Sequence, residues 1–264
     1  KKLKGLRKEN KIALAVDNRS LTALQWFPID RDLSYNDVVR WMYDSLYEMN
    51  LECDIVDAAA LDPEKYRMIV TPALYCASEE LLGRLEAFVK KGGVLVSSFK
   101  SFVADPQVRV YADTQPHILH SVFGMSYNQF TDPGTASIKG QPVQYFAELL
   151  KCEEAESLAD YEHPYWGAYA GITRCQKEKG HAYYVGCFTS REILKEVYEK
   201  AAKDAGILEM GPELEFPVIV RSGVTQEGKK LHYLLHYSQE KREISCPFAC
   251  VRDLLDGKVY EKGS

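Results

Sequence analysis

The sequence predicts an α/β protein with a doubly wound parallel sheet, followed by a small antiparallel β domain. Two observations carry this prediction. Through residues 11–99, short apolar runs alternate with amphipathic helical stretches, a pattern typical of right-handed crossovers in a parallel sheet. Near Gly211 and Pro212 the pattern changes to short strand-like runs separated by turns. The chain has 264 residues, which suits one large or two modest domains.

The first predicted strand is the continuous apolar run Lys11–Val16, which is typical of a strand buried on both faces. We expect a polar loop over Asp17–Leu33 after this strand. Ser34 and Asp37 then resemble a capping box. Apolar residues at helical spacing follow them and predict a helix that ends at Asn50.

The alternation continues with strands predicted over Cys53–Val56, Met68–Val70 and Val94–Val96. Before the last of these, Ser78 is expected to cap a helix that Gly92 ends, because Ser favours the first position and Gly the residue after the last turn. These elements together are typical of the flavodoxin-like class of doubly wound folds.

The middle of the chain, residues 102–179, is predicted as a long excursion from the sheet, because turn-forming residues interrupt it. Pro116–Phe123 is its one predicted helix. Order returns with a strand over His181–Val185, after which Thr189 and Glu192 predict a capping box for the last helix.

The region after Phe216 predicts a small antiparallel domain of about 50 residues, which is marginal on its own. We therefore expect it to lean on the larger domain or on another part of a longer chain. Its predicted strands are Val218–Val220, Leu231–Tyr237, Ile244–Cys246 and Lys258–Tyr260.

Composition and charge exclude several classes of protein. No apolar run approaches the roughly 18 residues that a membrane helix needs, and we expect no membrane partner. The formal net charge of −5 argues against a nucleic-acid partner. The 7 cysteines are scattered without a CxxC pair, which predicts buried thiols, a reducing cytoplasmic setting, and neither a metal site nor a cofactor. Because the chain starts with Lys, we expect it to be a piece of a longer protein.

Catalytic motifs are absent from the sequence: there is no GxGxxG, Walker lysine, GxSxG or HExxH pattern. The strand Val94–Ser98 before a loop is similar to class I glutamine amidotransferases, which carry a nucleophilic Cys in a Gly-flanked turn at that point. Here Val96–Lys100 has neither the Cys nor the glycines, and Phe99 is expected to resist the strained backbone of such a turn. Cys76, near a predicted helix N-terminus, is an alternative nucleophile.

Aromatic residues in or beside the predicted loops are the candidate contact residues. Trp26 and Phe27 fall in the loop after the first strand, and Trp166 falls in the segment Tyr161–Trp166. Loops at the carboxyl ends of a parallel sheet are where such folds bind ligands, and exposed aromatics favour interfaces. We interpret Trp26, Phe27 and Trp166 as interface or pocket-wall residues, and Trp41 as a core residue.

Several segments, in this order, resemble one family of enzymes. The resemblance begins at Lys11–Asn18 and Ser20–Pro28 and continues along nearly the whole chain. The further segments are Tyr35–Tyr43, Tyr47–Asn50, Val70–Tyr75, Phe88–Gly93, Gly180–Gly186, Leu231–His236 and Asp253–Gly257. This pattern resembles the middle domain and small C-terminal β domain of family 42 glycoside hydrolases, the β-galactosidases.

The resemblance implies an amidotransferase-like middle domain that forms homotrimers, while both catalytic glutamates lie in an N-terminal barrel. The chain would then be non-catalytic, with itself, the parent chain's barrel and, indirectly, a galactoside as partners. Residues 1–10 would be the remnant of a linker from the barrel, 11–210 the trimerisation domain and 213–264 the C-terminal domain, for which the resemblance implies one further strand and hence truncation. The alternative is a stand-alone amidotransferase-like enzyme or a sugar-binding protein that uses Cys76 or the aromatic loops.

Overall fold

The computed structural model describes residues 5–208, 214 and 216–263. The chain divides into two compact units. The larger unit comprises Asn10–Ser45 and Cys53–Ile207, and the smaller one comprises Lys1–Glu9, Leu46–Glu52 and Leu208–Ser264. The predicted change of pattern at Gly211 and Pro212 lies outside the described residues, so the domain limits stay a prediction.

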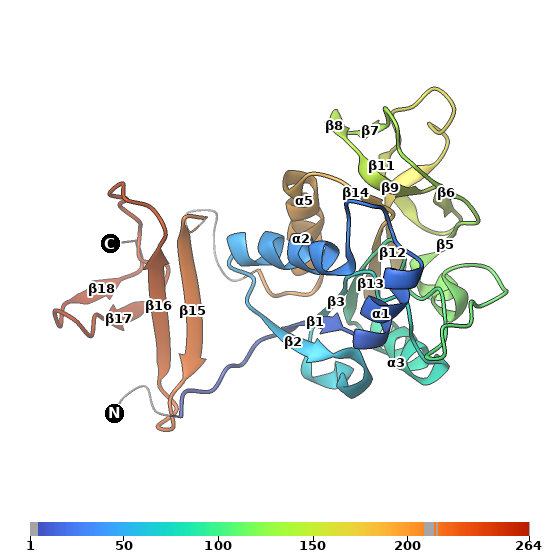
Figure 1. The fold of residues 1–264 in the computed structure, drawn as a ribbon. Helices are drawn as coiled ribbons and strands as arrows, with labels where there is room; N and C mark the ends of the chain where they lie inside the picture. The colour runs from blue at the N-terminus through green and yellow to red at the C-terminus, as the bar shows by residue number, and fades with distance from the viewer. Residues whose placement is uncertain (1–4, 209–213, 215, 264) are drawn as a thin grey trace. The chain divides into compact units, whose positions relative to one another are not determined.

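The larger unit is built on a mixed sheet of seven strands in the order β11-β12-β13-β4-β3-β1-β2 (Figure 1). Strands β2, β1, β3, β4 and β13 run parallel in that order, which is the flavodoxin-like order 2-1-3-4-5 in sequence terms. The predicted doubly wound α/β class is therefore confirmed. The strand bounds are β1 Ile12–Val16, β2 Cys53–Asp57, β3 Met68–Thr71, β4 Val94–Ser98, β11 Glu156–Asp160, β12 Ala170–Lys177 and β13 Gly180–Val185.

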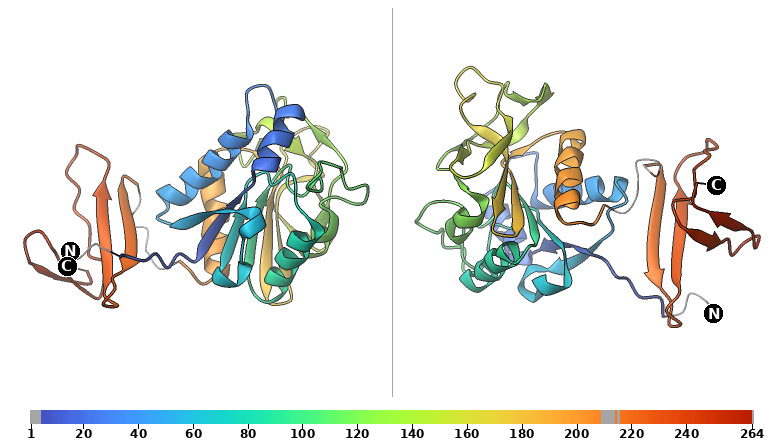
Figure 2. Two further views of the ribbon diagram at one scale, coloured as in Figure 1. Left: turned by 60° about the horizontal axis from the view of Figure 1, so that its bottom comes forward. Right: turned by 180° about the vertical axis from the view of Figure 1, so that it is seen from behind.

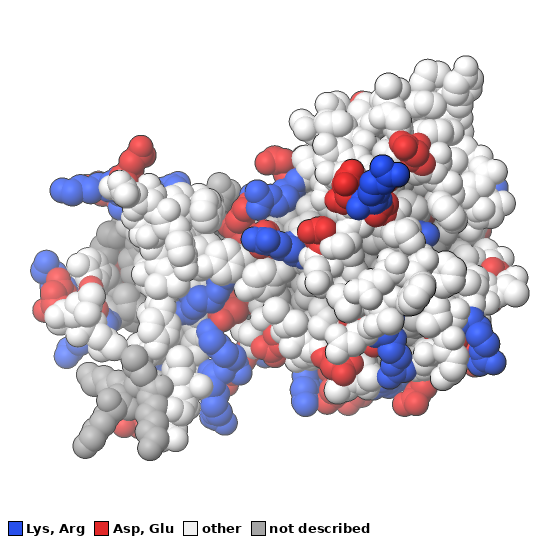
Figure 3. Space-filling model, viewed as in Figure 1, with Lys and Arg blue, Asp and Glu red and all other residues white. Residues whose placement is uncertain are grey.

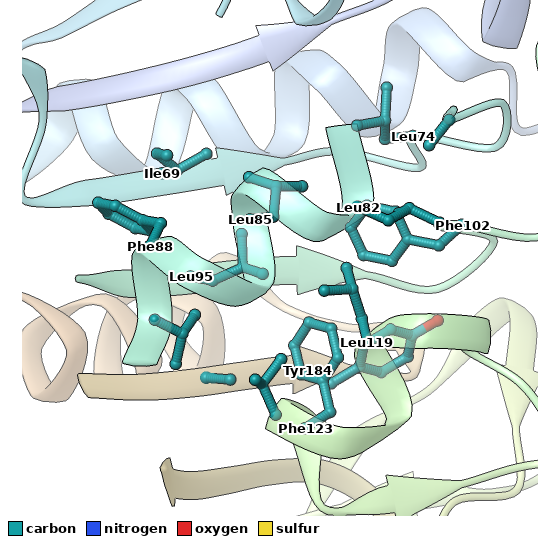
Figure 4. Packing of buried hydrophobic residues seen from close by; sticks show 14 of the residues in the cluster. Ile69, Leu74, Leu82, Leu85, Phe88, Leu95, Phe102, Leu119, Phe123 and Tyr184 are labelled. Atoms are coloured by element: carbon teal, nitrogen blue, oxygen red, sulfur yellow. The ribbon is translucent and has the colours of Figure 1, made fainter. Parts of the chain in front are cut away.

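Helices cover both faces of this sheet, as Figure 2 shows. On one face, α3 and α4 bury a large apolar cluster in which Leu82, Leu85, Phe102 and Phe123 surround Tyr184 and its sheet neighbours (Figure 4). On the other face lie α2 and α5, which are joined where Tyr198 of α5 donates to the carbonyl of Met42. The helix bounds are α1 Asn18–Trp26, α2 Tyr35–Glu48, α3 Glu79–Lys90, α4 His120–Phe123 and α5 Arg191–Asp204.

Two helix starts differ from the prediction. The expected loop over Asp17–Leu33 is wrong for its first part, because Asp17 caps α1: its side chain accepts from the backbone N–H of Ser20 at 2.7 Å. The cap of α5 is Ser190 rather than Thr189. The predicted capping box at Ser34 is confirmed, since Asp37 accepts from both the N–H and the hydroxyl of Ser34.

The middle of the chain leaves the sheet after β4, but the excursion predicted over residues 102–179 is wrong for its last part, because β11 and β12 already belong to the main sheet. Its predicted helix at Pro116–Phe123 is confirmed by η3 and α4, and β11 and β12 extend the main sheet in antiparallel pairing. Its short elements are η3 His117–Leu119, β5 Met125–Ser126, β6 Phe130–Thr131, β7 Ser137–Ile138, β8 Gln141–Pro142, β9 Gln144–Glu148, β10 Lys151–Cys152 and β14 Cys187–Phe188. Two further turns of 3₁₀ helix, η1 Ala58–Ala60 and η2 Pro63–Lys65, link β2 to β3.

The smaller unit contains two antiparallel hairpins. Strands β15 Val218–Val224 and β16 Lys230–His236 pair along their whole length, and β17 Cys250–Arg252 pairs with β18 Val259–Glu261. The predicted strand at Ile244–Cys246 is wrong, because the pairing segment begins at Cys250. At the other end of the unit, Arg7 pairs with Val224 through two backbone hydrogen bonds.

Candidate functional site

The carboxyl edge of the parallel strands holds the polar groups of the larger unit, as expected for a doubly wound sheet. Asp17 follows β1, and its carboxylate accepts from the hydroxyl of Ser20 at 2.9 Å. That hydroxyl in turn accepts from the N–H of Cys76, which follows β3, at 2.9 Å. The ends of β1 and β3, where the strand order changes direction, are thus tied together by buried side chains.

Cys76 is buried at this edge, and burial raises the pKa of its thiol to about 11. The nearby carboxylate of Asp17 opposes ionisation further. Helix α3 begins three residues later at Glu79 and has Ser78 as its cap. Burial therefore disfavours the thiolate that a nucleophilic Cys76 would need.

The turn after β4 has an unusual backbone. Lys100 adopts a left-handed conformation with φ of 59°, which costs free energy in a residue with a side chain. Phe99, the residue before it, does not adopt a left-handed conformation. The strained residue of this turn is therefore Lys100 rather than Phe99. A carboxylate supports the turn: Glu148, at the end of β9, accepts from the backbone N–H of Lys100 at 2.9 Å.

Glu148 is buried beneath this turn. Its second oxygen accepts from the hydroxyl of Tyr184 at 2.9 Å, and the hydroxyl of Tyr127 faces the same pair without a well-directed hydrogen bond in the described residues. Burial raises the pKa of Glu148 to about 7, although the donors from Lys100 and Tyr184 oppose that rise. The sequence offered no signal for this carboxyl, because its partners are 36 and 48 residues away.

The predicted contact residues differ in exposure. Trp26 is the last residue of α1 and is 80% exposed, and Phe27 after it is 56% exposed. They therefore lie at a helix end rather than in the middle of a loop. Figure 3 shows a group of acidic and basic side chains above the position of α1, and the exposed Arg31 and Asp32 follow Phe27 in the sequence. Trp166 is only half-buried and stacks on His163, with ring centroids 3.9 Å apart, while Trp41 is buried, as predicted.

The structure describes no group of three or more His, Cys, Asp or Glu side chains arranged to hold a metal ion. Asp17 and Glu148 are the buried carboxylates of the described residues, and both accept hydrogen bonds that fix the backbone. Within residues 5–208, 214 and 216–263, none of the helices is long and apolar enough to cross a lipid bilayer.

The fold and this edge define a doubly wound α/β domain without a nucleophilic turn. A sequence model described as "Beta-galactosidase trimerisation domain" matches residues 10–208. The chain belongs to this family.

Curated relatives and solved structures agree with the family. The chain is 24% identical over 270 residues to β-galactosidase LacZ of Lactobacillus acidophilus, covering 98% of this chain and 40% of that protein. It is 28% identical over 243 residues to β-galactosidase BgaB of Geobacillus sp., covering 88% and 35%. Its fold is similar to the crystal structure of β-galactosidase from Bacillus circulans sp. alkalophilus, with a TM-score of 0.88, 24% identity and coverage of 99% and 40%.

Proposed function

We propose that this chain is the self-associating, non-catalytic part of a β-galactosidase that hydrolyses terminal β-D-galactosides, and that it forms a homotrimer. The observation that carries the proposal is the family match over residues 10–208. The two relatives above are both β-galactosidases, and the chain spans only 40% and 35% of their lengths. We assign the hydrolytic carboxylates to the catalytic barrel that the resemblance implies for the parent enzyme.

The chemistry of the described residues supports a non-catalytic role. Glycoside hydrolysis needs two carboxyl groups that flank the scissile bond at a set separation. The buried carboxylates, Asp17 and Glu148, instead cap α1 and support the Lys100 turn. The deprotonated thiol that an amidotransferase-like mechanism requires is disfavoured at Cys76 by burial.

The proposed contact surface is the end of α1. Trp26 and Phe27 are large, mostly exposed and next to each other at the end of α1. Interfaces are enriched in such aromatic anchors, and one that is fully desolvated contributes about 2 kcal/mol or more on truncation. We assign Trp26 and Phe27 to contact with a neighbouring subunit, beside the mouth of its barrel, with Trp166 as a further contact candidate.

This assignment predicts the effect of Trp26→Ala in the whole enzyme. Loss of the indole should weaken the trimer about thirtyfold or raise KM for a galactoside, because about 2 kcal/mol of contact energy is removed. Sedimentation equilibrium and steady-state kinetics measure the two effects. Ile55→Ala is the matched control, since Ile55 is 59% exposed on β2. Trimer affinity and KM both equal to the wild-type values would show that Trp26 is not a contact residue.

The cysteines support a cytoplasmic location for the proposed enzyme. All 7 cysteines of the sequence are free thiols in the structure. Exposed free thiols, such as those of Cys152 and Cys250, persist in a reducing compartment and tend to form disulfides in an oxidising one.

A further inference from the structure

The strained turn after β4 closes over a buried acid. Glu148 is only 1% exposed, and its carboxyl accepts from the backbone N–H of Lys100 and from the hydroxyl of Tyr184, each at 2.9 Å. Both donors are uncharged, and among the described residues no ion pair neutralises the carboxyl. A carboxylate buried without a counter-ion is unfavourable, so this arrangement favours the protonated form of Glu148.

Most groups that face Glu148 keep one protonation state while it titrates. Burial raises the pKa of each of these neighbouring side chains, so that they stay neutral: Tyr127, Tyr161, Tyr184 and Cys187. Within the described residues, the charged group that acts on Glu148 is the ammonium of Lys100. It lies 4.3 Å from the centre of the Phe130 ring, and burial lowers its pKa while the charge of Glu148 raises it. Ionisation of Glu148 therefore creates a charge that its neutral neighbours do not balance.

The turn can rotate between fixed ends. On one side, the N–H of Phe99 donates to the carbonyl of Val185 at 2.7 Å. On the other side, the N–H of Phe102 donates to the carbonyl of Leu74 at 2.7 Å. Between these two anchors, Lys100 is held in the left-handed region with φ of 59°. Rotation of Lys100 out of this region releases strain and leaves both anchors intact.

A cavity provides the space into which the turn can open. It has a volume of about 660 Å³, and Lys100, Phe130 and Glu148 are among the residues that line it. Solvent that enters this cavity reaches the carboxyl of Glu148 once Lys100 moves aside. Because hydration stabilises a carboxylate much more than burial among uncharged groups does, ionisation of Glu148 favours the open turn.

We propose that the turn at Lys100 is a pH-operated lid, which stays closed over Glu148 while this acid is protonated and opens to the cavity when the acid loses its proton. In the closed form, burial raises the pKa of Glu148 to about 7 from its ordinary 4.5, and hydration in the open form returns the pKa toward the ordinary value. The closed form is therefore fully favoured below the ordinary pKa and is lost as pH rises through about 7. The lid lies within the larger unit and does not depend on the proposed trimer.

Amide hydrogen exchange of the 264-residue chain tests the lid, with Phe99 as the internal reference for Lys100. Base catalysis accelerates both amides alike, so the ratio of the Lys100 rate to the Phe99 rate reports opening of the turn. This ratio should rise at least tenfold between about pH 5.5 and about pH 8.5. Glu148→Gln, which stays uncharged and keeps an acceptor for the Lys100 N–H, should hold the ratio constant. Glu199→Gln, which removes an exposed carboxyl of α5, is the matched control and should retain the wild-type rise.

A constant ratio in the wild-type chain would overturn the proposal, and so would an equal rise in the Glu148→Gln variant. An increase at Leu95 of β4 that equals the increase at Lys100 would show unfolding of the sheet rather than a lid, and would also overturn it. A carbon-13 titration of the Glu148 carboxyl in the wild-type chain replaces the variant if Glu148→Gln does not fold. The midpoint of that titration should coincide with the midpoint of the exchange ratio, and separate midpoints would contradict the lid.

Discussion

At the residue scale, burial decides what the titratable groups of the carboxyl edge can do. The buried Glu148 accepts hydrogen bonds from the backbone N–H of Lys100 and the hydroxyl of Tyr184. Cys76 is buried after β3, and its backbone N–H donates to the hydroxyl of Ser20, which lies after β1. Neither role follows from local sequence, because the partners come from distant strands. The missing amidotransferase residues at Val96–Lys100, in contrast, were readable directly from the chain.

Glu148 predicts a pH dependence of stability. Its pKa is about 7 in the folded chain and 4.5 ordinarily, so the folded state holds the proton more tightly. The resulting stability is fully present below the ordinary pKa and is lost as pH rises through about 7. Relative to Glu148→Gln, the wild-type free energy of unfolding should fall by up to about 3 kcal/mol between about pH 5 and pH 8. Urea unfolding measures this difference, and parallel pH profiles would contradict it.

Cys76 predicts a pattern of thiol reactivity. Its pKa of about 11 and its burial should keep it unmodified when iodoacetamide is added to the folded chain at about pH 8. The exposed Cys152 and Cys250 should be modified first. Peptide mass mapping over time gives the order. Faster labelling of Cys76 than of the exposed thiols would instead support the rival reading of an enzyme with a Cys76 nucleophile.

At the element scale, apolar runs and apolar periodicity predicted the five parallel strands and the helices α2, α3 and α5, because buried segments leave a clear pattern, whereas β11 and β12 of the same sheet were missed. Helix α1 was missed because its buried side chains are few and mostly small: Ser20, Ala23 and Leu24. The short strands of the middle region were not predictable, since two-residue ladders depend on tertiary neighbours rather than on local propensity.

In the smaller unit, we expect the stability of the β15–β16 hairpin to depend on Asn50. Its side-chain amide donates to the carbonyls of Leu214 and Val218, and its oxygen accepts from the N–H of Val220 at 2.7 Å. Asn50→Ala should leave these buried backbone groups unpaired and destabilise the hairpin by about 2–3 kcal/mol. Faster hydrogen exchange at Val220, with unchanged exchange at Leu95 of β4, is the expected result. Protection at Val220 equal to wild type would contradict it.

At the scale of the whole molecule, the larger unit combines a well-packed sheet with exposed aromatic side chains at the end of α1. Large side chains left in water, such as Trp26, are typical of a surface that another molecule covers. The family that the chain belongs to is described as a β-galactosidase trimerisation domain. Both observations support the proposed role of the chain in subunit assembly.

The most direct test of this account is sedimentation velocity of the chain alone, run beside a β-galactosidase assay of the same sample. We expect a species of about three times the 30.0 kDa of one chain, without hydrolysis of a nitrophenyl galactoside. A species that remains a monomer at micromolar concentration, or galactosidase activity that migrates with the chain, would contradict it.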